Sequence, residues 1–308
     1  APTGPLSVDL GQAVDTLAGT VAGNLVDEIA DVDVTLGAVT AEASLDADAE
    51  PVRDYTIAGG QLTIDSTTLS NLTATLNGAV GDLQTSLDGI DTLVNQGVLG
   101  LLGAIPLVQA NLSVGTTSLT GAISDLLTGE LTSDEYPGVS INLGTGVISV
   151  DLAQIQPLND LAPGTNILGG AALQRVQLAI TDIISDLVDD LNADLLEAIR
   201  GITIEGDVGV PAIGIPPLQT PAVPLLSIDT TVGALLDDST VGITVLGAIG
   251  VDLSLVVGAL VDPIEDLLLD LGGAIDTAVA PVGTVLAPAL NEILPRLITI
   301  TVNNLEDD

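Results

Sequence analysis

The chain has 308 residues and a formal net charge of −38, which results from 42 acidic and only four basic residues. It contains no His, Cys, Met, Trp or Phe, and its basic residues are all arginines. Because such a charge repels phosphate backbones, we expect no nucleic-acid partner. Without His, Cys or Lys the chain has no Ser-His-Asp triad, Cys-His pair, ordinary zinc site or Walker lysine, so we expect it not to be an enzyme.

One catalytic class needs none of these residues, because paired carboxylates can cleave glycosides. Such sites usually hold the sugar against aromatic faces, and only Tyr55 and Tyr136 could supply them. A soluble enzyme is therefore the weakest of the functional hypotheses.

The composition indicates a protein that works outside the cell. A chain without Cys or Met offers little to oxidation, and one without Lys offers few sites to trypsin. The apolar stretches 97–108 and 241–261 do not suit a bilayer, since the first is short and the second carries Asp252. We therefore expect no transmembrane segment and an extracellular or cell-surface location.

Four short phrases recur, each of which alternates apolar and small residues and then ends in Asp: Leu6–Asp9, Leu62–Asp65, Ile148–Asp151 and Ile249–Asp252. The alternation predicts a strand, and the Asp can cap a helix that follows it. The spacings are uneven, which excludes a solenoid of fixed period. We predict an α+β fold of mixed, largely antiparallel β-sheets covered by amphipathic helices and built from loosely repeated strand–helix–strand modules.

Residues 1–135 are predicted to hold the first two modules. Module one has a helix over about 11–30 and a return strand over 32–45 that is broken by Gly37. Module two is predicted to open with a hairpin over 54–65 that turns at Gly59-Gly60. Helices over about 67–105 and a return strand over 108–114 complete it.

Residues 136–308 are predicted to hold modules three and four. Module three opens with a hairpin over 139–151 and ends with the helix 171–200 and the strand 202–210. Module four has a helix that starts at Asp262, with Pro263 in its first turn. Its return strand covers 297–302.

The helix 171–200 has the clearest pattern in the chain. Asp182, Asp186 and Asp189 should face water, while Arg200 and Gly201 suit the last turn and the end of the helix. The opposite face carries apolar residues at spacings of three and four: Leu173, Val176, Ile180, Ile183, Leu187, Leu191 and Leu195.

The segment 211–228 interleaves prolines with apolar residues, and proline is poorly suited to a central strand. We expect a strap that lies over its own domain or provides a contact surface for a neighbouring chain. Together with an uncharged strand near the end of the sequence, it supplies the residues predicted to mediate self-association: Pro211, Ile213, Ile215, Pro216, Pro217, Leu218, Leu297, Ile298, Ile300 and Val302.

The acidity has two interpretations, a strongly solvating surface or a set of ligands for divalent cations. Asp46, Asp48 and Glu50 alternate in a predicted loop, and carboxylates at that spacing can converge on Ca²⁺. The glycine and the twelfth-position glutamate of an EF-hand are missing. Calcium is therefore the one cofactor considered, and these three residues are its predicted ligands.

The hairpin after Arg53, the hairpin 139–151 and the phrase 297–304 resemble the choice-of-anchor G proteins, which are secreted, surface-associated proteins of Gram-positive actinobacteria. The resemblance implies secretion and attachment to the cell surface, and it implies no activity or binding residues. Members of that family extend beyond both ends of this chain, so attachment to the cell wall would use parts that are absent here.

These observations lead to a functional expectation. We expect an extracellular structural protein that self-associates into a homo-oligomer or homopolymer, such as a filament joined by strand or strap exchange. The alternative is a surface adhesin or binding module stabilised by calcium.

Overall fold

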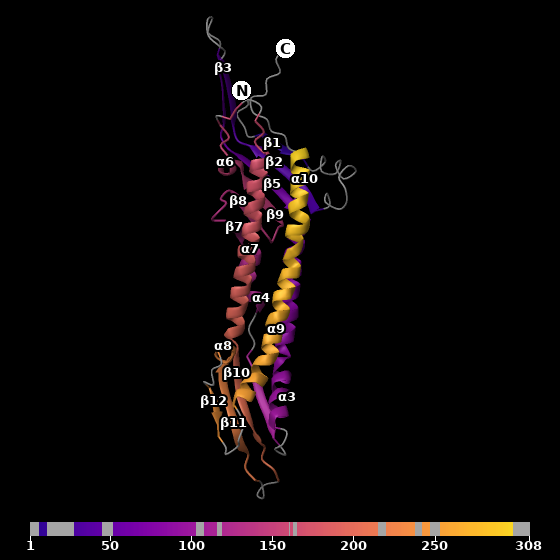
Figure 1. Ribbon diagram of the computed structural model, residues 1–308, viewed down its shortest axis with the longest axis vertical. Coiled ribbons are helices and arrows are strands. Elements are labelled where there is room, and N and C mark those ends of the chain that lie inside the picture. Colours follow the sequence, from indigo (N-terminus) through magenta and orange to yellow (C-terminus); the bar gives the residue numbers. More distant parts are fainter. Residues whose placement is uncertain are drawn as a thin grey trace. The chain divides into compact units, whose positions relative to one another are not determined.

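A computed structural model describes residues 6–10, 28–44, 52–102, 108–115, 119–159, 161–162, 165–214, 220–237, 242–246 and 253–297 (Figure 1). The chain divides into two compact units, the first formed by 1–75, 125–189 and 277–308 and the second by 76–124 and 190–276. The predicted division lies after residue 135, whereas each compact unit takes segments from both sides of that position. The four divisions fall inside four helices, α2 (Thr67–Asp88), α5 (Ser124–Thr128), α7 (Gly170–Arg200) and α9 (Leu253–Pro281).

The first unit contains a six-stranded sheet with the order β1-β2-β5-β9-β8-β7, in which every pair of neighbours is antiparallel. Its strands are β1 (Leu6–Asp9), β2 (Ile29–Leu36), β5 (Gly60–Ser66), β7 (Glu130–Thr132), β8 (Val139–Asn142) and β9 (Val147–Asp151). Burial alternates along the strands, so one face of the sheet is apolar and the other is polar. The buried face includes Val32, Val34, Leu62, Ile64, Ile141, Ile148 and Val150. The predicted α+β class with largely antiparallel sheets is confirmed.

The predicted hairpin at Gly59-Gly60 is wrong, although the strands on either side of it exist. β4 (Val52–Ile57) pairs with β3 (Val39–Ser44), and β5 pairs with β2, so 29–44 and 52–66 run side by side. Gly59 has a φ of 143° and its carbonyl accepts a hydrogen bond from the Gly37 N–H at 2.8 Å. The apolar alternation of β2 matches that of β5, so these two strands pair with each other. The glycine pair therefore lies where the pairing changes from β3–β4 to β2–β5, and not in a tight turn.

Other local predictions in the first unit are confirmed. β8 and β9 form the predicted hairpin over 139–151. Asp151 caps the short helix α6 (Leu152–Ile155) by accepting a hydrogen bond from the Ala153 N–H. At α2, by contrast, the cap comes from Ser66 rather than from Asp65, since the Leu69 N–H donates to the Ser66 hydroxyl.

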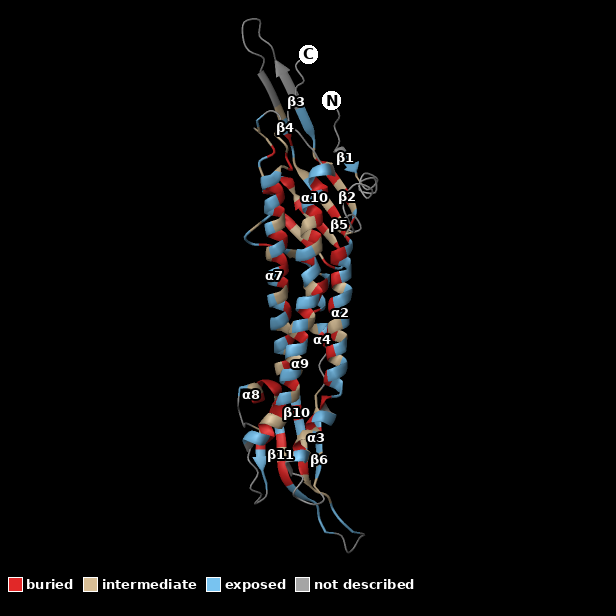
Figure 2. Cartoon of the chain, turned by 45° about the vertical axis from the view of Figure 1, so that its right-hand side comes forward, coloured by how far each residue is buried: buried red, intermediate tan, exposed pale blue. Residues whose placement is uncertain are grey.

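Helix α7 ends at Arg200, before Gly201, as predicted, and it buries the whole predicted apolar stripe. Buried and exposed residues alternate along its length (Figure 2). Asp186 and Asp189 are exposed as predicted, but Asp182 is half-buried. Its carboxylate accepts a hydrogen bond of 2.5 Å from the buried hydroxyl of Ser133, so this position is occupied by a tertiary contact that helical periodicity cannot reveal.

The second unit contains a four-stranded antiparallel sheet with the order β12-β11-β10-β6. Its strands are β6 (Gln109–Val114), β10 (Thr203–Val210), β11 (Val223–Thr231) and β12 (Ile243–Val245). Helices α3 (Ile90–Leu102), α4 (Leu119–Ala122) and α8 (Val232–Leu236) lie within the same unit. Helix α5 (Ser124–Thr128) follows α4 in the chain. The predicted helices are therefore present from 67 to 102, and the strands predicted over 108–114 and 202–210 are present as β6 and β10.

The predicted strap over 211–228 is wrong for its second half, because residues from Val223 onwards belong to β11, an inner strand of this sheet. Pro224 is accommodated at a bulge opposite Gly209, at the end of β11 that β12 does not reach. Of the first half, the structure describes residues 211–214, which follow β10, and 220–222, which precede β11, and Ile213 and Thr220 form an isolated bridge.

Two helix boundaries also differ from the predictions. α9 begins at Leu253 and passes through Asp262 and Pro263, so these residues do not start a helix. Proline inside a helix costs about 3 kcal/mol, and the buried Val256, Val257, Leu260, Val261 and Ile264 on both sides of it offset that cost.

Leu297 is the last residue of helix α10 (Ala287–Leu297), so the predicted strand does not begin there. Ala289, Leu290, Ile293 and Leu294 are buried at helical spacing, which extends the helix to this point. α10 follows α9 through the π-helix η2 (Val282–Leu286). Among the described residues, no helix combines the length and the apolar character needed to cross a bilayer.

Leu187 tests the contribution of the α7 stripe, because its side chain is only 1 % exposed. Leu187→Ala removes buried methyl groups and leaves a cavity, so we expect the free energy of unfolding to fall by about 2–5 kcal/mol. Leu178→Ala is the matched control on the same helix, since Leu178 is 43 % exposed and its truncation should change stability by less than about 0.5 kcal/mol. Equal losses in urea denaturation of the two variants would contradict the assignment of the buried face.

Candidate functional site

The structure describes only some of the residues that are predicted to bind calcium or to mediate self-association. The predicted calcium ligands Asp46, Asp48 and Glu50 lie outside the described residues. Among the predicted self-association residues, Pro211 is half-buried and Ile213 is 45 % exposed, in the segment that follows β10. The described part of the chain does not include Ile215, Pro216, Pro217, Leu218, Ile298, Ile300 or Val302.

A group of carboxylates lies on the polar face of the six-stranded sheet. Asp9 of β1 lies directly opposite Asp33 of β2, and Asp31 of β2 lies opposite Asp65 of β5. Carboxylate oxygens of Asp9, Asp31 and Asp33 all lie within 4.8 Å of one another. Like charges placed opposite each other across strands are destabilising, so this arrangement has a cost unless a cation or a proton neutralises it.

The acidic group changes the protonation of its central member. Partial burial and then the negative charges of Asp31, Asp9 and Asp65 raise the pKa of Asp33 above its ordinary value of 3.8. Both causes disfavour the ionised form. Asp33 is therefore the carboxylate at which bound protons and bound cations would compete.

The same polar face carries a row of hydroxyls next to the acidic group. Five cross-strand pairings place one residue from each strand in a single line across the sheet: Asp9, Asp33, Thr63, Ser149, Ser140 and Thr132. Directly opposite residues project from the same face. The line therefore changes from carboxylates on β1 and β2 to hydroxyls on β5, β9, β8 and β7.

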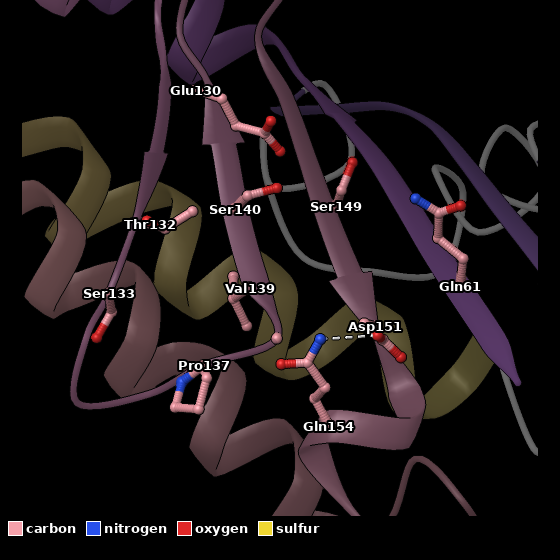
Figure 3. Close-up of a pocket in the computed structure, with 11 residues that line it drawn as sticks. Gln61, Glu130, Thr132, Ser133, Pro137, Val139, Ser140, Ser149, Asp151 and Gln154 are labelled. Carbon is pink, nitrogen blue, oxygen red and sulfur yellow. Dashed lines mark hydrogen bonds between the residues drawn. The ribbon is translucent and has the colours of Figure 1, made fainter.

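A cleft of about 430 Å³ lies over the hydroxyl end of this row (Figure 3). Ser140 and Ser149 lie on its strands, Glu130 and Gln61 lie toward its ends, and Gln154 of α6 approaches from the helix side. The Gln154 amide donates a hydrogen bond of 2.9 Å to the carboxylate of Asp151, which also lines the cleft. The cleft thus combines amides, hydroxyls and carboxylates, and it contains no arginine and no aromatic ring.

Two strand edges are closed by asparagine side chains. Asn159 accepts a hydrogen bond from the Ile57 N–H at 2.7 Å and donates to the Ile57 carbonyl at 3.3 Å. In the second unit, Asn95 of α3 contacts the N–H and the carbonyl of Leu112 in the same way, at 2.9 Å each. Each amide takes the place of a neighbouring strand, so β4 and β6 each lose an open bonding position at these points.

The outer edge of β3 has no such cover among the described residues. The Ala58 N–H donates to the Ala38 carbonyl, so alternation turns the N–H groups of Val39 and Ala41 away from β4. β3 contains one acidic residue and no proline, and Val39 is 40 % exposed. The other open sheet edges of the described chain are shorter, at four residues in β1 and three each in β7 and β12.

Sequence reasoning missed these features for a common reason. Asp9 is predicted to cap a helix, and Asp31 and Asp33 flank the predicted boundary between the helix over about 11–30 and the return strand over 32–45, whereas strand register brings the three together. The alternation of Asp31 and Asp33 was a usable signal, since residues two apart in a strand share a face. No local pattern marks Asn95 or Asn159, because their partners are 17 and 102 residues away.

Comparison with known protein families assigns the chain to one family. The model of a domain of unknown function, DUF8394, matches residues 1–308, so the chain belongs to that family. No curated protein and no solved structure matches the chain.

Asp33→Asn tests the charge repulsion on the polar face. An acid whose pKa is higher in the folded state makes that state bind more protons than the unfolded chain, so stability falls as pH rises above the ordinary pKa. The variant lacks this penalty, and we expect it to unfold at a higher temperature than the wild type at about pH 7, with the difference shrinking toward about pH 4.

The control for this prediction is Asp189→Asn, which removes one exposed charge from α7. It reports the general effect of lowering the net charge, and it should stabilise less than Asp33→Asn in low salt without divalent cations. If Asp33→Asn unfolds at the same temperature as the control or the wild type at neutral pH, the assigned repulsion is contradicted.

Proposed function

We propose that the protein is an extracellular structural component of a cell surface that self-associates by pairing strands between copies. The observation that carries the proposal is the outer edge of β3, which no described residue covers, whereas each of the other two six-residue edge strands is contacted by a side-chain amide at one residue. β6 and β4 have six residues each and are both contacted by an asparagine amide. An open edge of this length is a template for a strand from another chain.

The composition supports the extracellular and structural parts of the proposal. The whole sequence lacks the oxidisable Cys and Met and the His and Lys of common catalytic sites. The resemblance to choice-of-anchor G proteins agrees with a location at the surface of a cell. A net charge of −38 opposes contact between copies, so the contact must be hydrogen-bonded or apolar rather than ionic.

Exposed apolar side chains support a contact between copies as well. Ile213 and Val223 at the β10–β11 hairpin are 45 % and 49 % exposed, and Leu246 beside β12 is 52 % exposed. All three residues are accessible, and one of them, Ile213, is among those first predicted to self-associate. They offer a second contact, so that each copy could join two neighbours and the contact could propagate into a filament.

Ala41→Pro tests the β3 edge. The substitution removes an N–H that points away from β4, so the β3–β4 pairing keeps its hydrogen bonds while the outer edge loses one donor. We expect the wild type to form large species at high protein concentration and high salt, where repulsion is screened over about 10 Å or less. The variant should sediment mainly as a monomer.

Ala41→Ser is the matched control, because it changes the same residue and keeps the N–H. Circular dichroism and thermal unfolding verify that both variants remain folded. A wild-type chain that stays monomeric under these conditions would contradict the proposal, and so would assembly of Ala41→Pro at the wild-type level.

We propose as the second candidate a surface adhesin or binding module that calcium stabilises. The convergence of Asp9, Asp31 and Asp33 supports it, since Ca²⁺ prefers several oxygen ligands. A cation bound there would also relieve the repulsion that raises the pKa of Asp33. The predicted ligands Asp46, Asp48 and Glu50 form a separate candidate site under the same proposal.

Calorimetry in CaCl₂ and in NaCl at matched ionic strength tests the calcium candidate. A folded-state site raises the free energy of unfolding by about 2.7 kcal/mol at a hundred times its Kd. Loss of this rise in Asp31→Asn would assign it to the sheet, and loss in the combined variant of Asp46, Asp48 and Glu50 would assign it to the loop. Identical midpoints in the two salts for the wild type would exclude both sites.

A further inference from the structure

We infer that the cleft over β5, β7, β8 and β9 is a binding site for a neutral, polyhydroxylated ligand, namely a saccharide. The inference is independent of the proposed self-association, because the cleft lies on the face of the six-stranded sheet and not at the edge of β3. Its volume of about 430 Å³ falls within the range of about 300–1,000 Å³ that ligand pockets occupy.

The wall of the cleft is held in place before any ligand arrives. The loop between β7 and β8 is fixed at one end by Ser133, which donates to Asp182 of α7 and accepts from the Tyr136 N–H at 2.8 Å. At the other end the Gly138 carbonyl accepts a hydrogen bond of 2.7 Å from the Asp151 N–H. A rigid wall lowers the conformational entropy that the protein must lose when a ligand binds.

Gly138 brings this loop against the residue that extends from α6. Its φ is 97°, and a Cβ at this position would meet the Cβ of Gln154 at 2.6 Å. The side chain of Gln154 therefore packs directly on the loop, and its amide nitrogen is held by Asp151 at 2.9 Å. This arrangement leaves the amide oxygen of Gln154 as an oriented acceptor at the cleft.

The polar groups that remain are suited to hydroxyls. The side chains of Gln61, Glu130, Thr132, Ser140 and Ser149 form no hydrogen bond with another described residue. They include donors and acceptors, and each can exchange a water for a ligand hydroxyl. Two of them, Ser140 and Ser149, are half-buried, so their hydroxyls face the cleft from its floor rather than from its rim.

The charge of the cleft selects against other ligands. Glu130 and Asp151 repel phosphates, sulfates and uronic acids, and no cation in the lining compensates for them. The lining also has no aromatic ring on which a sugar could stack, so hydrogen bonds must hold the ligand. The expected affinity is accordingly weak, and the expected preference is for neutral sugars over uronates.

Saturation-transfer NMR on the intact chain tests the inference with maltotriose, mannotriose and chitotriose as neutral probes. A trigalacturonate is the anionic probe, and spermine is the cationic one. We expect a saturable signal from at least one neutral trisaccharide and none from the uronate. Removal of both hydroxyls in Ser140→Ala/Ser149→Ala should weaken that binding about tenfold or more.

Ser7→Ala is the control, since Ser7 is an exposed serine of β1 outside the cleft and should leave binding unchanged. The experiment is run at low protein concentration and low salt, conditions that disfavour assembly of a chain with a net charge of −38, so its outcome does not depend on assembly. The inference is overturned if no neutral probe binds, if only spermine or the uronate binds, or if the serine double variant binds as the wild type does.

Discussion

Burial of branched aliphatic side chains is the interaction on which the rest of this structure depends. The chain has no cysteine for a disulfide, and the largest fully buried side chains among its described residues are all Ile or Leu. Only four polar residues of the described chain are buried, and each of them is a Ser or a Thr. The 42 acidic groups act against compaction, so helices and sheets must place them on outer faces while the apolar faces meet.

This division explains where functional features arise. A strand that buries one face must expose the other, and six neighbouring strands expose it as one surface. Along the line from Asp9 to Thr132 on this surface, the residues of β1 and β2 are acidic and those of β5, β9, β8 and β7 bear hydroxyls. The acidic group and the cleft are therefore two regions of one sheet face, and they differ in the ligand chemistry that they offer.

The sequence allowed prediction of those elements whose signals are local. The α7 stripe, the 139–151 hairpin and the Asp151 cap depend on residues within a few positions of one another, and all three are confirmed. Gly59-Gly60 and Pro263 carry equally strong local signals, but tertiary pairing and apolar packing outweigh them. The candidate sites were less predictable, because Asp9 meets Asp33 and Thr132 meets Ser140 through register, which one sequence does not reveal.

Each of the two strand edges is closed by one asparagine amide, so each closure depends on a single chemical group. Each must donate to a carbonyl and accept from an N–H of the same residue, Leu112 or Ile57. Asparagine is among the less durable residues, because its amide hydrolyses to a carboxylate. An aspartate at position 95 or 159 could accept but not donate, and it would turn a negative charge toward the carbonyl it formerly bound. Slow hydrolysis of these two amides over the lifetime of the protein would therefore convert closed strand edges into open ones.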